Sequence, residues 1–259
     1  MKKTLLLSSA ARRLKNITQL LNWREAKNIL SIDYELKELR IPEKSSIVVL
    51  APHPDDDIFG VGGLIGSLSK KMCSIHIVYL CSGESGTVSG ASDTNLSETR
   101  KKEAIAALVL LHGDTTIEFL NQPDGSLQVS AKIIEKLSSI FKNHKPDYII
   151  APWFGDNHED HQTTFQIMRK SLLGISPDKI LLYEVWTPLI PNRYIVIDDY
   201  IDAKIMAINE HTSQLSSRNY IDAIIGLNAY RAGMIGEGKY AECFIELTTK
   251  QFDTLCALY

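Results

Sequence analysis

The 259-residue sequence has no run of about twenty apolar residues, the length that a membrane-spanning helix needs. Its 28 Lys and Arg residues stand against 31 Asp and Glu, so the net charge of −3 gives no positive field that would indicate nucleic-acid binding. Its four cysteines contain no CxxC pair, which argues against a zinc knuckle or a redox motif. We expect reduced, mostly buried thiols in a cytoplasmic protein.

Internal repeats and long linkers are also missing, so we expect one α/β domain. We predict that residues 45–259 form this domain and that residues 1–44 form a helical arm and a connector. Leu14, Ile17 and Leu20 fall at helical spacing and give the arm an apolar face. The basic start resembles a signal peptide, but its apolar core is very short, and we favour the arm. We expect it to dock on protein, either the core or a second subunit; peripheral membrane contact is the alternative.

One segment, residues 46–63, joins a buried strand to a dense polar cluster. The apolar run 47–50 predicts a strand that ends at Pro52, and four polar side chains follow within five residues: His53, Asp55, Asp56 and Asp57. The carboxyl end of a strand is where open α/β sheets bind ligands. Adjacent carboxylates repel one another, but a divalent cation keeps them ionised, and imidazole with carboxylate suits zinc. A catalytic zinc takes three protein ligands, so a further His is expected elsewhere.

A second polar cluster follows another predicted strand about a hundred residues later. The apolar run 147–151 ends at Pro152, and histidines and acids then gather: His158, Glu159, Asp160 and His161. His158 and His161 are three residues apart and share one face of a helical turn. One of the two completes the set of metal ligands. The other is then free for proton transfer or for stabilising an oxyanion.

Other interpretations explain the first cluster less well. An acidic helix N-terminus would account for one or two Asp residues, but not for His53 beside them. A helix is predicted over about 59–71, and its Gly60-Val61-Gly62-Gly63 could form a dinucleotide-binding loop. However, these glycines follow the acids, and three carboxylates would repel a pyrophosphate. The Gly- and Ser-rich segment 81–96 follows the next strand and forms either a lid over the site or a disordered connection.

The two clusters together resemble the PIG-L/LmbE-like family of zinc-dependent N-acetylglucosaminyl de-N-acetylases. The resemblance extends from about Ile47 to Gln214 and rests on two motifs: His53-Pro54-Asp55-Asp56 with the glycines after it, and Pro152 followed by His158-Glu159-Asp160-His161. Weaker matches support it: Ser82-Gly83-Glu84-Ser85-Gly86, Arg100-x-x-Glu103, Pro123-Asp124-Gly125, and Lys204 with His211-x-Ser213-Gln214. It implies a single Rossmann-like, three-layer α/β/α domain with a mostly parallel sheet.

The resemblance also implies roles for individual residues. It implies a Zn²⁺ cofactor held by three ligands, His53, Asp56 and His161, although Fe²⁺ or Mn²⁺ could use the same set. Asp55 would act as the general base, and His158 would stabilise the oxyanion or protonate the leaving amine.

Four further residues would surround these groups. The family uses positions matching Arg100 and Asp124 around the substrate. Asp57 and Asp160 would support the ligands, and Asp57 stands where the family usually has Glu.

The activity implied is hydrolysis of the N-acetyl group of an N-acetylglucosamine-type amino sugar or its conjugate. A zinc amidase acting on a non-sugar or lipid-linked amide stays open, as does a non-catalytic metal- or sugar-binding relative. The expected partner is the N-acetylated amino-sugar substrate, and a homo-oligomer is compatible with the sequence; nucleic acid is not expected.

Overall fold

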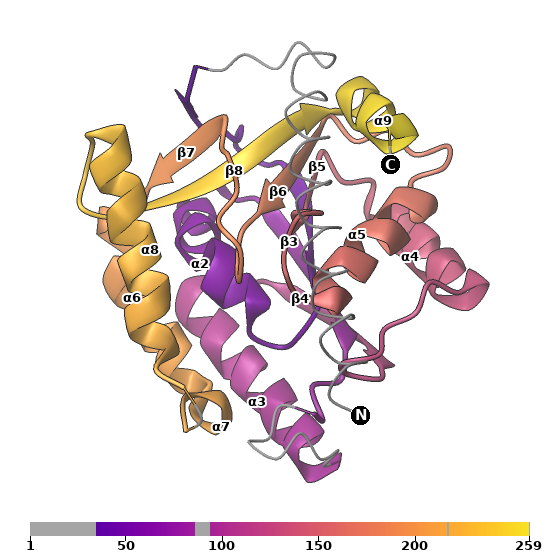
Figure 1. Ribbon diagram of the computed structural model, residues 1–259, viewed down its shortest axis with the longest axis horizontal. Helices are drawn as coiled ribbons and strands as arrows, with labels where there is room; N and C mark the ends of the chain where they lie inside the picture. The colour runs from indigo at the N-terminus through magenta and orange to yellow at the C-terminus, as the bar shows by residue number, and fades with distance from the viewer. Residues whose placement is uncertain (1–34, 86–93, 217, 259) are drawn as a thin grey trace, which may run out of the picture.

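The computed structural model describes residues 35–85, 94–216 and 218–258 (Figure 1). Residues 1–34 of the predicted arm and connector, and residues 86–93 of the Gly- and Ser-rich segment, lie outside this range. The described strands form one sheet in the order β1-β7-β8-β6-β5-β2-β3-β4. Their bounds are Lys37–Glu38, Ser46–Ala51, Ser74–Cys81, Thr116–Gln122, Tyr148–Pro152, Lys179–Tyr183, Arg193–Val196 and Ala241–Thr248 for β1 to β8.

Helices cover both faces of this sheet (Figure 1). On one face lie α2 (Asp56–Leu68), α3 (Thr94–Leu111), α6 (Ile201–Glu210) and α8 (Tyr220–Ile235), with the short α7 (Thr212–Leu215) beside α3. On the other lie α4 (Ala131–His144), α5 (Glu159–Ser171) and α9 (Thr249–Leu258). No described helix has the length and apolar character needed to cross a membrane.

The alternation of side chains along β2 explains the two cores. Val48 and Leu50 point into an apolar cluster with α4, α5 and α9, whereas Ile47 and Val49 point into a second cluster with α2, α3 and α6. Within the described residues, β8 alone runs against its neighbours, pairing antiparallel with β6 and β7. The predicted three-layer α/β/α fold with a mostly parallel sheet is confirmed.

The strand order creates a switch point beside β2. The chain passes from β2 to β3 and β4 on one side, then returns to place β5 and β6 on the other. As a result, β2 pairs in parallel with β5, with Val49 opposite Ile150. The carboxyl ends of β2 and β5 are therefore adjacent, and in such sheets a crevice for ligands opens at this position.

Helix α2 begins earlier than the pattern predicted, at Asp56 instead of Phe59. Asp56 and Asp57 thus occupy its first turn, where carboxylates are favoured by the helix dipole. The glycine cluster lies inside this helix, where a Cβ on Gly60 would come within 2.3 Å of the Tyr183 ring. The glycines therefore permit close packing and do not form a phosphate loop.

Candidate active site

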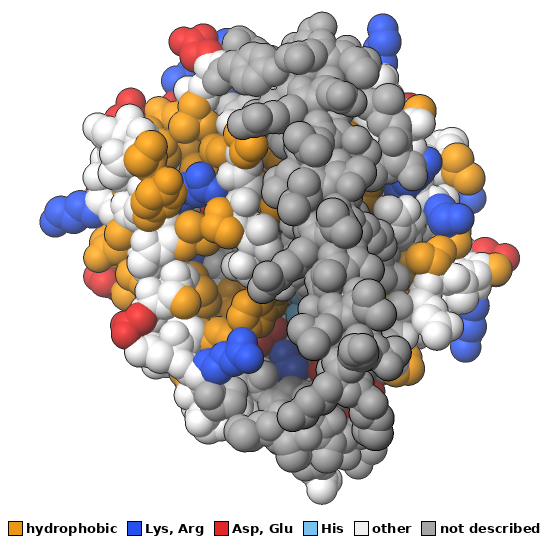
Figure 2. Space-filling model, in the orientation of Figure 1, with side chains coloured by type: hydrophobic (Ala, Val, Ile, Leu, Met, Phe, Trp, Pro, Cys, Tyr) orange, Lys and Arg blue, Asp and Glu red, His pale blue; other side chains and the backbone are white. Residues whose placement is uncertain are grey.

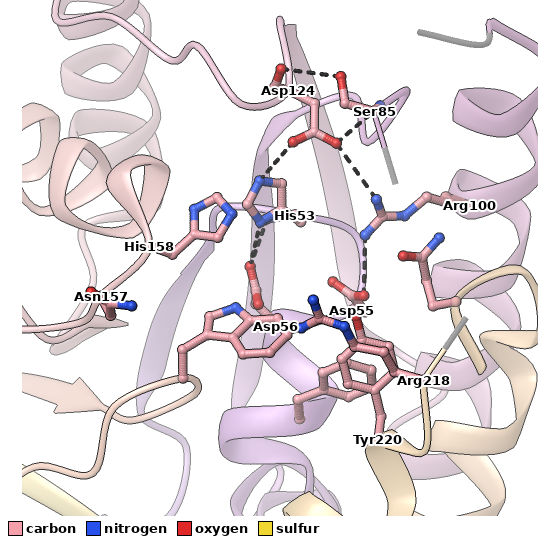
Figure 3. A pocket seen from close by; sticks show the side chains of 13 residues that line it. His53, Asp55, Asp56, Ser85, Arg100, Asp124, Asn157, His158, Arg218 and Tyr220 are labelled. Carbon is pink, nitrogen blue, oxygen red and sulfur yellow. Dashed lines mark hydrogen bonds and ion pairs between the residues drawn. The ribbon is translucent and has the colours of Figure 1, made fainter. Parts of the chain in front are cut away.

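A cavity of about 560 Å³ opens at the carboxyl ends of β2 and β5. Six of the predicted site residues line it: His53, Asp55, Asp56, Arg100, Asp124 and His158 (Figure 3). Figure 2 shows acidic, basic and histidine side chains in a hollow that has apolar side chains along one side. The fold thus brings both sequence clusters to one place.

The three predicted ligands converge on one carboxylate oxygen. Asp56 Oδ2 lies 3.1 Å from His53 Nδ1 and 3.2 Å from His161 Nε2, and all three side chains are buried. One ring nitrogen from each of His53, His158 and His161 also lies within 4.8 Å of the other two. His158 therefore borders the same point without contacting Asp56 as closely as the other two do. This geometry suits a small cation.

His161 gives an independent test of that fit. Its side chain is fully buried, and neither ring nitrogen has a well-formed hydrogen bond within the described residues. Burial lowers the pKa of His161, but Asp56 and Asp156 outweigh burial and raise this pKa to about 9. The surrounding carboxylates thus favour positive charge at this position. An imidazole with open nitrogens beside such acids is a fitting metal ligand.

The other side of His53 is held by two carboxylates. Its Nε2 lies 3.1 Å from Asp160 Oδ2 and 3.1 Å from Asp124 Oδ1. Asp160 is fixed in turn by the backbone N–H groups of Gly125 and Leu127, at 2.7 and 3.0 Å. A proton on Nε2 leaves Nδ1 to face Asp56, the arrangement in which carboxylates usually orient a metal-binding histidine.

Cys81 lies on this same side of His53, where His53, Cys81 and Asp160 form a second group of suitable donor atoms. Asp160 already accepts two backbone hydrogen bonds there, and burial raises the pKa of the Cys81 thiol to about 11. Because a thiol binds metal as the thiolate, we assign this group to supporting His53.

Asp55 faces the cavity beside Arg100 (Figure 3). Arg100 Nη2 lies 3.1 Å from Asp55 Oδ2, and its Nη1 donates to the Gly83 carbonyl at 3.0 Å and lies 3.7 Å from Asp124 Oδ2. Burial raises the pKa of Asp55, Arg100 opposes this, and the balance leaves the pKa above its ordinary value. The predicted substrate-binding arginine thus contacts the predicted base directly.

His158 is the N-cap of α5, which fixes its tautomer. Its Nδ1 accepts a hydrogen bond from the Asp160 backbone N–H at 3.2 Å, so a neutral ring carries its proton on Nε2. Burial lowers the pKa of His158, and His53 and His161 act in the same direction. The structure therefore favours a neutral N–H donor beside the ligand cluster.

Asp57, the other residue predicted to support the ligands, makes its hydrogen bond to β3. Its Oδ2 accepts a hydrogen bond from the Tyr79 hydroxyl at 2.8 Å, and its Oδ1 has no hydrogen-bond partner among the described residues. Burial raises the pKa of Asp57 to about 7, against the effect of Tyr79. It joins the start of α2 to β3 beneath the site.

Asp156 is a site residue that the motifs missed. It is fully buried, its Oδ2 lies 3.4 Å from His161 Nδ1, and it accepts hydrogen bonds from the backbone N–H groups of His158 and Trp186 at 3.0 and 3.1 Å. Asp156 thus faces the second nitrogen of a predicted ligand, as Asp160 does for His53. Its place just after a buried strand was the signal that could have identified it.

An aromatic wall on one side of the cavity was also missed. Trp186 and Tyr220 meet edge to face at 5.7 Å, and Phe59 lies 5.3 Å from Tyr220. The Arg218 guanidinium lies 5.6 Å above the Trp186 ring and reaches into the cavity (Figure 3). Phe59 comes from α2, Trp186 from the segment after β6, and Arg218 and Tyr220 from just before and at the start of α8. The last two segments carry no recognisable motif.

Glu103 explains why the weaker motifs occur together. Its carboxylate accepts hydrogen bonds from the Thr212 hydroxyl at 2.9 Å and from the Ser213 N–H and hydroxyl at 2.8 and 2.7 Å. One turn of α3 therefore supplies Arg100 to the site and holds α7, whose Gln214 lines the cavity.

Fold and site together define an α/β protein with a His- and Asp-lined pocket at the switch point of its sheet. Residues 48–172 match the family model described as PIG-L, GlcNAc-PI de-N-acetylase, as the resemblance of the two motifs predicted.

Similar proteins extend the similarity beyond the matched segment. Diacetylchitobiose deacetylase of Thermococcus kodakarensis is 23% identical over 212 residues, covering 74% of this chain and 79% of the relative. The probable N-acetyl-alpha-D-glucosaminyl L-malate deacetylase 2 of Bacillus anthracis is 25% identical over 197 residues, which cover 66% of this chain and 82% of the relative. The solved structure of N,N'-diacetylchitobiose deacetylase from Pyrococcus horikoshii superimposes with a TM-score of 0.71 at 25% identity. The match covers 87% of this chain and 91% of that structure's chain.

Proposed function

We propose that this protein is a metal-dependent hydrolase that removes the N-acetyl group from an N-acetylglucosamine-type amino sugar or its conjugate. The observation that carries the proposal is the position of Asp55, which faces the cavity directly beside the convergence of His53, Asp56 and His161. The match to the family model and the similarity to named deacetylases support the same reaction.

The residues that would hold the metal are His53, Asp56 and His161. We propose Zn²⁺, although Fe²⁺ or Mn²⁺ suits the same donors. Such an ion supplies Lewis-acid polarisation and lowers the pKa of a water toward about 7. The chain itself holds the ligand rings in place through Asp160 and Asp156.

Asp55 then acts as the general base. It accepts the proton of the water that attacks the acetamide carbon, and its raised pKa makes it a better proton acceptor than an ordinary carboxylate. Arg100, 3.1 Å away, orients the carboxylate and limits this rise. Such general-base assistance contributes about 10²–10⁴-fold to the rate.

His158 acts on the acetamide group of the substrate. In its neutral form the Nε2–H donates to the acetamide oxygen, where charge develops during attack. The leaving nitrogen also needs a proton as the C–N bond breaks, and the proton that Asp55 took from the water supplies it, directly or through His158. The products are acetate and the free amino sugar.

The aromatic wall and Arg218 bear on the rest of the substrate. The flat faces of Trp186 and Tyr220 suit the C–H surface of a sugar ring, and the Arg218 guanidinium suits an anionic substituent. The two relatives are named as a deacetylase of diacetylchitobiose and as a probable deacetylase of N-acetyl-alpha-D-glucosaminyl L-malate. We therefore propose a substrate in which the amino sugar is linked to a second group.

The test is acetate release from a panel containing diacetylchitobiose, N-acetylglucosaminyl malate and a lipid-linked N-acetylglucosamine, before and after chelation. We expect release from at least one member, loss after chelation and recovery with Zn²⁺. Asp55→Asn should retain the metal and lose about 10²-fold or more in kcat. The exposed Asp114→Asn is the control and should match the wild type. Metal-independent release, or full turnover by Asp55→Asn, would contradict the proposal.

A further inference from the structure

Helix α2 is interrupted just after the turn that enters the active site. Val61 has φ −137° and ψ 18°, far from helical values, although residues 56–68 otherwise form one helix. In an unbroken helix the Gly63 N–H would donate to the Phe59 carbonyl, and the Leu64 N–H to the Gly60 carbonyl. At this break those backbone groups need other partners, because all of them are buried.

A buried ion pair provides these partners. The Gly63 N–H donates to Glu242 Oε1 at 2.7 Å, and the Leu64 N–H donates to Glu242 Oε2 at 2.8 Å. Lys204 Nζ donates to the Phe59 carbonyl at 3.0 Å and to Glu242 Oε1 at 2.7 Å. The pair is therefore inserted between the Phe59 carbonyl and the Gly63 N–H that would normally bond to it, and it also accepts the hydrogen bond of the Leu64 N–H.

The pair is fully enclosed and fully satisfied. Lys204 has no exposed surface and Glu242 is 1% exposed. The third proton of the ammonium goes to Asn228 Oδ1 at 3.0 Å, while Asn228 Nδ2 donates to the Ala241 carbonyl at 3.1 Å. Gly62 makes room for the lysine, since a Cβ there would lie 3.2 Å from Lys204 Cγ.

Stability alone is a weak explanation for such a pair. Replacing a buried ion pair with apolar residues of similar size is often neutral or stabilising. What this pair supplies instead is a fixed geometry on both sides of the break. The turn before the break carries Asp56 and Phe59, with Asp55 at its start, and all three line the cavity.

We propose that Lys204 and Glu242 are positioning residues for the reaction. By bonding to the last carbonyl of the first turn and to the first N–H groups beyond it, they hold that turn in the orientation that aims Asp55 and Asp56 into the cavity. This inference rests on the proposed function for its kinetic consequence, although the local effect on α2 does not depend on it.

The test is the double variant Lys204→Met/Glu242→Gln, which removes both charges and so leaves no unpaired ion. We expect kcat to fall about 10–100-fold while KM stays within threefold and the metal content is retained. Amide hydrogen exchange should accelerate within residues 55–68 and stay unchanged in α4 and α5. A kcat within threefold of the wild type, or a loss that merely follows a global rise in exchange, would overturn the inference.

A second buried ion pair gives the matched control. Arg231 donates from Nε to Glu184 Oε1 at 2.8 Å and joins α8 to the segment after β6, without bonding to the backbone of α2. Arg231→Met/Glu184→Gln should therefore change stability but leave kcat within threefold and exchange in residues 55–68 unaltered. An equal loss of kcat in this control would show that any buried ion pair has the same effect, and the inference would fail.

Two further conditions keep the experiment decisive. If the Lys204/Glu242 double variant does not fold, Asn228→Ala takes its place, because it removes one partner of the ammonium and no charge. A fall in kcat of at least threefold, with faster amide hydrogen exchange confined to α2, would support the inference. No change in kcat or in the exchange rate would overturn it. If the wild type releases no acetate from any substrate, the proposed function fails, and the exchange measurement alone judges the pair.

Discussion

The three consecutive acids of the first cluster have three different surroundings. Asp55 lies beside Arg100, Asp56 beside two histidines, and Asp57 beside the Tyr79 hydroxyl. Burial acts to raise the pKa of each, but the histidines hold that of Asp56 well below its usual range, whereas those of Asp55 and Asp57 end above it. Neighbours in sequence thus differ in chemistry because the start of a helix points them in different directions.

Asp156 gives a direct test at the scale of one residue. Asp156→Asn keeps the size of the side chain but removes the charge facing His161 Nδ1. Loss of such a partner typically lowers metal affinity about 10–100-fold. Titration of the chelated protein with Zn²⁺, followed by calorimetry, measures this. Glu159→Gln, an exposed acid in the same turn, is the control and should bind as the wild type does; unchanged affinity in Asp156→Asn would refute the role assigned to it.

The motifs identified the residues that follow a strand end or open a helix, and the fold assembled them around one cavity. They could not identify Trp186, Arg218 or Tyr220. These side chains reach the cavity because the crossover after β6 and the start of α8 pass over the same edge of the sheet. Nothing in their spacing along the chain records that meeting, which depends on long-range packing.

His76 predicts how stability depends on pH away from the site. Burial lowers the pKa of His76 to about 4, and the neighbouring His144 acts in the same direction. Between about pH 4 and 6.5 the unfolded chain binds more protons there, so the free energy of unfolding should rise with pH across this window and be fully regained above it.

Urea unfolding at several pH values tests this. His76→Gln should flatten the slope of unfolding free energy between pH 4 and 6.5. Thr116→Val removes the hydroxyl 2.8 Å from His76 Nδ1 but keeps the imidazole, and should retain the slope. Equal slopes in the wild type and His76→Gln would show that other groups cause it.

At the scale of elements, α2 is the helix on which the site depends. A Cβ on Gly60 would lie 2.3 Å from the ring of Tyr183, which is fully buried and held by a hydrogen bond from its hydroxyl to the Leu50 carbonyl. Because the ring has no room to move, Gly60→Ala should destabilise the protein by about 1–3 kcal/mol, the usual cost of overpacking. Denaturant unfolding measures this.

Gly226 supplies the control for that measurement. It lies in α8 with no atom within 4 Å of the position that a Cβ would take. Gly226→Ala should therefore stabilise by about 0.5–1 kcal/mol through helix propensity alone. A similar gain at Gly60 would mean that the contact with Tyr183 relaxes freely.

Element prediction succeeded where the pattern was strong and failed where packing decides. The buried strands before both polar clusters were found because their apolar runs are continuous. The start of α2 was placed three residues late, since polar residues at a helix start resemble a loop. The strand β1 (Lys37–Glu38) has no apolar alternation and is defined by its pairing with β7.

At the scale of the whole molecule, the sheet gathers charges that would repel one another without a cation. Asp56, Asp124, Asp156 and Asp160 all lie within ion-pair distance of His53 or His161 at the switch point. The unfolded chain separates these groups, so a metal ion should bind the folded state preferentially and stabilise all of it.

The size of this effect can be estimated. At 100 times its Kd, Zn²⁺ stabilises the folded state by about 2.7 kcal/mol, and a domain of this size gains roughly 2–4 °C in Tm per kcal/mol, so chelation should lower Tm by roughly 5–10 °C. Scanning calorimetry of the wild type before chelation, after it and after Zn²⁺ is restored measures this. In His161→Gln, which loses a proposed ligand, chelation should change the Tm little or not at all. An equal shift in both proteins would place the stabilising metal elsewhere, and an unchanged wild-type Tm would mean that the cluster holds together without one.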